Sequence, residues 1–195
     1  MLLGKAPLTA VELVSTITES FPLHATAVDQ TKFLRNALER LGISLGYTMA
    51  SPQFGFRPND SSFTLTWWQP GIGTVLAIAC EWGNAGDVAS AFTNLMTIKA
   101  PMKLVIFGSR DAGVERPDIL QRTDIDAVRK AVGAAIVDFS QHLEGELYVL
   151  LERVLQEGVF RAYDFVIPAN GKLALQFEDA AHVFRAREAY IASMR

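Results

Sequence analysis

The feature that most constrains this sequence is a pair of short apolar runs separated by an amphipathic segment. Thr74–Glu81 (TVLAIACE) and Met102–Phe107 (MKLVIF) are almost continuously apolar. Strands of this kind lie in the middle of a sheet that is covered on both faces. Between them, Asp87–Ile98 has apolar residues at helical spacing. The sequence therefore predicts a strand–helix–strand unit, with a right-handed crossover if the two strands are parallel.

Two helices are predicted before this unit. Thr9 and Glu12 have the T-x-x-E spacing of a capping box, in which a threonine hydroxyl and a glutamate carboxylate each accept a free backbone amide. A helix over 10–19 should follow. A second helix is predicted over 28–41, and Gly42 is the expected left-handed residue just after its end.

The other elements are predicted from changes of hydrophobic period and from turn residues. Strands are expected over 61–68, 146–151, 159–167 and 173–177, with turns over 70–73 and at Asn170-Gly171, and helices from 123 to about 142 and over 179–194. The fold class is therefore α/β, with α+β as the alternative, and has a central mixed sheet flanked by helices.

The length of 195 residues indicates a single domain. We expect it to span 1–195, with N-terminal helices over 1–45, a core over about 60–177 and a C-terminal helix over 179–194. The one cysteine, Cys80, requires no oxidising compartment. No apolar run reaches the ~20 residues of a membrane span, and no signal peptide is recognisable. We therefore expect a cytoplasmic protein with no membrane contact.

The charge pattern bears on the class of partner. The net charge is −3, and residues 58–98 contain no lysine or arginine. Proteins that bind nucleic acid normally present a basic surface. The overall charge thus argues against a nucleic-acid partner, although a local basic groove would still allow one.

Four short motifs carry a resemblance to a known family. They are LTW at 65–67, ACEWG at 79–83, FTNLM at 92–96 and KAPMK at 99–103. Together they resemble a group of uncharacterised prokaryotic proteins with the restriction-endonuclease-like, or PD-(D/E)XK, fold. In that group an acidic residue precedes the LTW pattern, E-x-E-W ends the next strand, D-F-x-K-L lies on the following helix, and K-A-P-x-K opens the strand after it. The resemblance covers residues 64–107 and implies that fold.

The resemblance also implies a nuclease site that this chain has largely lost. The family's acidic and basic site positions fall here on uncharged residues, namely Thr64, Ala79, Ala91 and Asn94. The charged remnant is Glu81, Lys99 and Lys103. Cleavage of a phosphodiester with a divalent ion needs at least two converging carboxylates, and Glu81 alone would hold Mg²⁺ weakly. No cofactor is therefore expected.

Three functions from different classes follow. The first is a catalytically inactive nuclease-fold domain that binds a protein or nucleic-acid partner. The second is an active Mg²⁺-dependent endonuclease with a rearranged site, in which Asp60 or Asp87 supplies the second carboxylate to Glu81 and Lys99 or Lys103 the amine. The third is a structural protein that forms a homodimer through its C-terminal helix or a sheet edge.

Simpler interpretations compete with a functional one for several of these residues. Glu81 could cap the following helix or pair with Lys103 instead of binding a metal. Trp67, Trp68 and Trp82 are more typical of packing than of base stacking. Cys80 lies inside an apolar strand, where a free cysteine acts as a small hydrophobic residue.

Overall fold

The computed structural model describes residues 8–19, 21–22, 26–50, 62–109, 125–139, 146–154, 159–166 and 182–185. The helices are α1 (Ala10–Thr18), α2 (Ala27–Ser44), α3 (Ala85–Met96) and α4 (Ile125–Phe139). The strands are β1 (Thr48–Ala50), β2 (Phe63–Gln69), β3 (Gly73–Glu81), β4 (Met102–Ser109), β5 (Leu147–Val154), β6 (Val159–Val166) and β7 (His182–Arg185).

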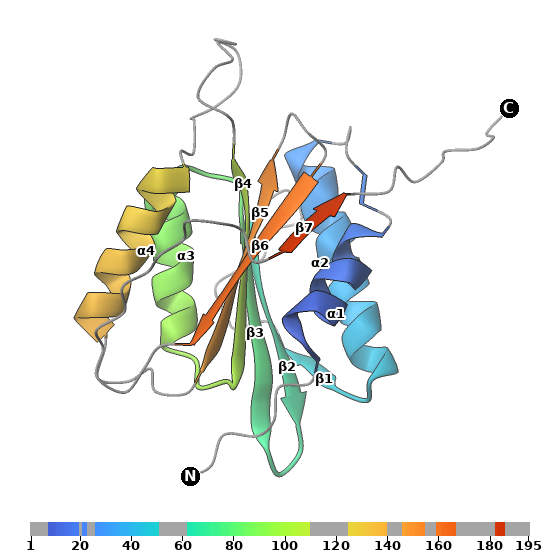
Figure 1. Cartoon of the computed structure of the whole chain (residues 1–195). Helices are drawn as coiled ribbons and strands as arrows, with labels where there is room; N and C mark the ends of the chain where they lie inside the picture. The colour runs from blue at the N-terminus through green and yellow to red at the C-terminus, as the bar shows by residue number, and fades with distance from the viewer. Residues whose placement is uncertain are drawn as a thin grey trace, which may run out of the picture.

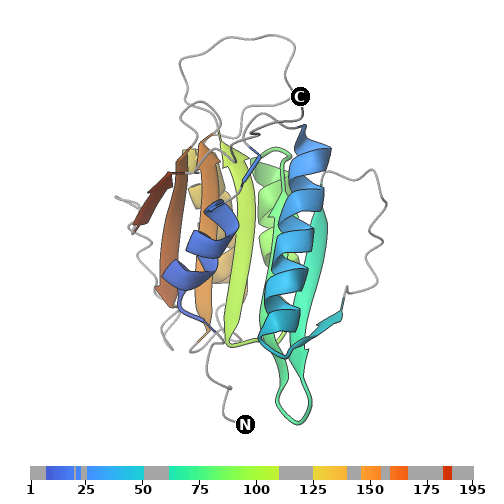
Figure 2. The same ribbon diagram turned by 90° about the vertical axis from the view of Figure 1, so that its right-hand side faces the viewer.

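The strands form one mixed sheet in the order β1-β2-β3-β4-β5-β6-β7. Strands β3, β4 and β5 are parallel to one another, and each remaining neighbouring pair is antiparallel. Helices α3 and α4 cover one face of the sheet and α1 and α2 cover the other (Figures 1 and 2). The predicted α/β class, with a mixed sheet between helices, is confirmed.

The two central apolar runs are buried on both faces, as their sequences predict. Along β3, Leu76 and Ile78 pack into the core beneath α1 and α2. Ala77 and Ala79 point to the opposite face and pack into the core beneath α3 and α4. Alternate side chains of a strand project to opposite faces, so one continuous apolar run supplies both cores. The β3–α3–β4 unit is therefore the predicted strand–helix–strand unit.

The start of α1 is confirmed, whereas the predicted end of α2 is wrong. Thr9 and Glu12 form the capping box, with the Thr9 amide 2.8 Å from the Glu12 carboxylate. Gly42 lies inside α2, and the left-handed residue after the helix is Gly46, with φ 84°. The Gly46 amide donates to Ile43 and the Tyr47 amide to Gly42, which is the Schellman pattern of a helix end.

The predicted C-terminal helix is wrong where the structure describes it. His182–Arg185 form strand β7, which pairs antiparallel with β6. The helical spacing of this segment is overridden by pairing with β6, whose outer edge would otherwise carry open backbone hydrogen-bonding groups. The Asn170-Gly171 hairpin and the 173–177 strand lie outside the described residues. None of the described helices is long and apolar enough to cross a membrane.

Candidate functional site: a hollow between β3 and α3

A hollow of about 240 Å³ lies between α3 and strands β2 and β3. Its floor comes from the start of β2 and the carboxyl end of β3, and its wall from the exposed side of α3. Thr64 on β2 lies directly opposite Ala79 on β3 in the antiparallel register. The hollow therefore forms at the carboxyl end of a central parallel strand, the end at which open α/β sheets usually bind ligands.

Every position at which the resemblance places an acidic nuclease residue lines the hollow. The position on α3 at which it places an amine lines the hollow too. These lining residues are Thr64, Ala79, Glu81, Ala91 and Asn94. Asp87, which the sequence offered as a replacement carboxylate, lines the same hollow. The other replacement, Asp60, lies outside the described residues. The five positions that the resemblance singled out on β2, β3 and α3 therefore lie together in space.

Glu81 is half-buried and is held by the turn that follows β3. Its Oε1 accepts a hydrogen bond of 2.8 Å from the Gly83 amide. Burial raises the pKa of the Glu81 carboxyl; the Gly83 amide opposes that effect and the nearby Asp87 charge adds to it. Glu81 and Asp87 line the same hollow, so their two negative charges repel one another.

Asp87 belongs to the capping box at the start of α3. Its Oδ2 accepts from the Asn84 amide at 3.0 Å, and Asn84 Oδ1 accepts from the Asp87 amide at 3.1 Å. A Cβ built on Gly83 would lie 2.3 Å from Asp87 Oδ2. The Glu-Trp-Gly motif therefore has a local explanation: glycine at position 83 leaves room for Asp87 and offers its amide to Glu81.

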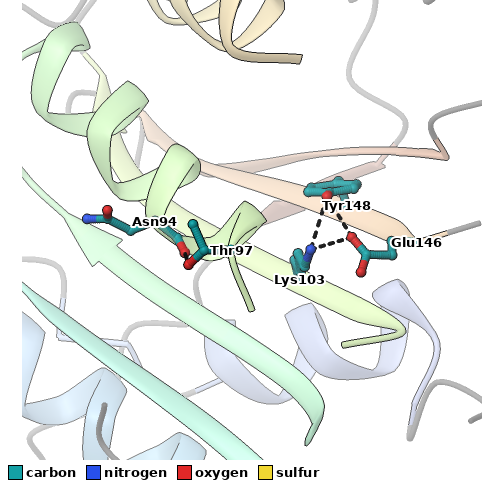
Figure 3. Close-up of polar contacts among 5 residues, drawn as sticks. All are labelled: Asn94, Thr97, Lys103, Glu146 and Tyr148. Atoms are coloured by element: carbon teal, nitrogen blue, oxygen red, sulfur yellow. Dashed lines mark hydrogen bonds and ion pairs between the residues drawn. The ribbon is translucent and has the colours of Figure 1, made fainter. Parts of the chain in front are cut away.

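Lys103 is not part of the hollow. Its amine is buried and forms an ion pair with Glu146 and a hydrogen bond of 3.1 Å with Tyr148 Oη, and Tyr148 in turn donates to Glu146 at 2.8 Å (Figure 3). Lys103 lies opposite Ala77, four residues before Glu81 and so about 13 Å away along the strand. The predicted pairing of Glu81 with Lys103 is wrong. In Figure 3, Asn94 of the hollow points away from this cluster.

The buried surroundings of Lys103 and Tyr148 change the pKa values of both side chains. Burial lowers the pKa of the Lys103 amine, and the hydrogen bond and charge of Glu146 partly restore it. Burial and the Glu146 charge raise the pKa of the Tyr148 hydroxyl. Lys99, the other predicted amine, is exposed between α3 and β4 and does not line the hollow. Neither lysine therefore faces Glu81.

Sequence reasoning missed Glu146, Tyr148 and Glu152. A lysine inside the apolar run MKLVIF indicates that a counter-charge is buried nearby, but it does not indicate where that residue lies in the sequence.

Glu152 lies in the same row of the sheet as Glu81, with Phe107 of β4 between them. It accepts a hydrogen bond of 2.7 Å from Tyr163 and does not line the hollow. Among the described residues, no three His, Cys, Asp or Glu side chains are placed to hold a metal ion.

Trp67, Trp82 and Cys80 pack in the core beneath α1 and α2. Trp67 is buried and stacks on Tyr47 with ring centroids 5.6 Å apart. Trp82 donates to Thr31 at 2.8 Å, whereas Trp68 is 40% exposed. Cys80 is buried, and burial raises the pKa of its thiol, so the predicted hydrophobic role is confirmed.

A comparison with protein-family models found no match for this sequence, and neither did a comparison with curated proteins.

Proposed function

We propose that this protein is a non-catalytic binding domain, built on a restriction-endonuclease-like arrangement whose active site has become a ligand hollow. One observation carries the proposal. The positions to which the resemblance assigns metal ligands and an amine line one hollow, but they hold Thr64, Ala79, Ala91 and Asn94. A methyl group, a hydroxyl and an amide cannot replace a set of carboxylates around Mg²⁺.

The charge of the hollow supports the same conclusion. Of the residues that the structure describes, the charged ones that line it are Glu81 and Asp87, and no lysine or arginine does. Phosphodiester cleavage requires positive charge where the phosphate binds, from a metal ion or from basic side chains. A phosphate would instead meet two carboxylates. The binding role that we propose therefore concerns a partner or ligand without phosphate at this site.

A second candidate function is the Mg²⁺-dependent endonuclease with a rearranged site. The observation in its favour is that Asp87 and Glu81 line the same hollow, so two carboxylates do converge there. Against it, Glu81 and Asp87 already accept hydrogen bonds from backbone amides, and Lys103 forms an ion pair with Glu146.

We propose that the protein acts in the cytoplasm. Its single cysteine, Cys80, is buried and free, which is compatible with a reducing compartment.

Metal titration and a cleavage assay separate the two functions. We expect calorimetry to detect no saturable Mg²⁺ or Mn²⁺ site and the protein to cut neither DNA nor RNA in the presence of either ion. The matched variant is Glu81→Gln, which keeps the acceptor for Gly83 and removes the charge. Metal-dependent cleavage that disappears in Glu81→Gln would contradict the proposal and establish the nuclease.

A further inference from the structure

We propose that the hollow between β3 and α3 binds a positively charged organic group, an ammonium or a guanidinium. The inference rests on the proposed non-catalytic function and names the class of ligand. It starts from the charge of the cavity: Glu81 and Asp87 line it together, and none of the basic residues in the described part of the chain does. A bound organic cation would relieve the repulsion between the two carboxylates.

The neutral part of the lining suits the same ligand. Thr64 offers a hydroxyl oxygen on the floor of the cavity, and Ser90 and Asn94 offer a hydroxyl and an amide oxygen on its wall. An ammonium has three donors and a guanidinium has five, so either can use acceptors on the floor and on the wall at once. The volume of about 240 Å³ lies below the roughly 300–1,000 Å³ of drug-sized sites, which points to a single side chain or a small amine.

The backbone contacts of the carboxylates favour an organic cation over Mg²⁺. One oxygen of Glu81 accepts the Gly83 amide and one oxygen of Asp87 accepts the Asn84 amide. Mg²⁺ demands near-octahedral coordination at short, fixed distances. A hydrogen-bonding cation has no such requirement, so the remaining carboxylate oxygens and the hydroxyls are sufficient for it.

The test uses three probes in calorimetric titrations of the full chain. Putrescine represents a free amine, while N-acetyl-lysine methylamide and N-acetyl-arginine methylamide represent a side chain of a partner protein. We expect saturable binding of at least one probe, and the class of the tighter probe identifies the source of the cation. Glu81→Gln should weaken binding at least tenfold, while Glu19→Gln, which removes an exposed charge just after α1, should leave it unchanged.

A second variant guards against a folding defect. Ala91→Leu fills the hollow from α3 while both carboxylates stay, and it should abolish binding with an unchanged circular dichroism spectrum. Absence of saturable binding, or equal weakening by Glu81→Gln and Glu19→Gln, would overturn the inference. Metal-dependent cleavage by the same preparation would instead overturn the proposed function, so the two failures are distinct.

Discussion

At the scale of single residues, the buried contact of Lys103 with Glu146 and Tyr148 shows how a charge inside an apolar strand is tolerated. Lys103 and Tyr148 are each 1% exposed and Glu146 is 4% exposed. Isolated charges are costly to bury, and a closed set of hydrogen bonds offsets that cost only while every member is present. Removing the charge of Lys103 or of Glu146 alone should therefore lower the free energy of unfolding more than removing the charge of both.

We predict that Lys103→Met lowers the free energy of unfolding by about 3–5 kcal/mol, because it leaves the Glu146 carboxylate buried without its counter-charge. Adding Glu146→Gln should recover part of that loss, since Gln is neutral and still accepts from Tyr148. Urea unfolding of the wild type, both single variants and the double variant measures the coupling. Strictly additive effects would show that the pair contributes no coupling energy.

At the scale of elements, two glycines near the end of α2, Gly42 and Gly46, have different roles. A Cβ on Gly42 would lie 2.4 Å from Met49 Cε and 2.8 Å from the Trp67 ring, whereas a Cβ on Gly46 would meet nothing within 4 Å. Gly42 permits close packing of α2 on β1 and β2. Gly46 instead supplies the left-handed conformation that ends the helix.

We predict that Gly42→Ala destabilises the protein by about 1–3 kcal/mol through overpacking, even though alanine favours helix. Gly46→Ala should cost about 1 kcal/mol through its positive φ alone, and Gly46→Asn less, because asparagine tolerates that conformation. Thermal unfolding of the three variants measures both effects. A stabilising Gly42→Ala would show that Met49 and Trp67 give way without cost.

The elements that could be predicted are those whose signal is local. The apolar runs of β3 and β4 and the capping box of α1 follow from residues adjacent in sequence. The errors lie where distant segments decide: β7 is a strand because β6 lies beside it, and Lys103 meets a glutamate 43 residues away in sequence. Thr64, Ala79, Glu81, Ala91 and Asn94 line one hollow because β2, β3 and α3 are neighbours in both sequence and space, whereas Lys99 and Lys103 lie outside it.

At the scale of the whole molecule, the pairing of β2 with β3 decides which side chains meet in the hollow. The register places Thr64 opposite Ala79, and Glu81 follows two residues later on the same face. Directly opposed side chains have Cβ atoms about 4.5–5.5 Å apart, which is close enough for two carboxylates to share one ion. The backbone could therefore place carboxylates around one ion if acidic residues stood at positions 64 and 79.

We predict that Thr64→Asp with Ala79→Asp creates a saturable Mn²⁺ site, because three carboxylates then converge at positions 64, 79 and 81. The double variant should be less stable than wild type without metal, since Ala79 is 2% exposed and an added charge there is buried. Mn²⁺ should raise its melting temperature by binding the folded state, and electron paramagnetic resonance should count the bound ion. The matched control is Thr64→Asn with Ala79→Asn, which has the same shape without the charge. Equal Mn²⁺ responses in the two double variants would argue against a depleted nuclease site, because binding would then not depend on the restored acids.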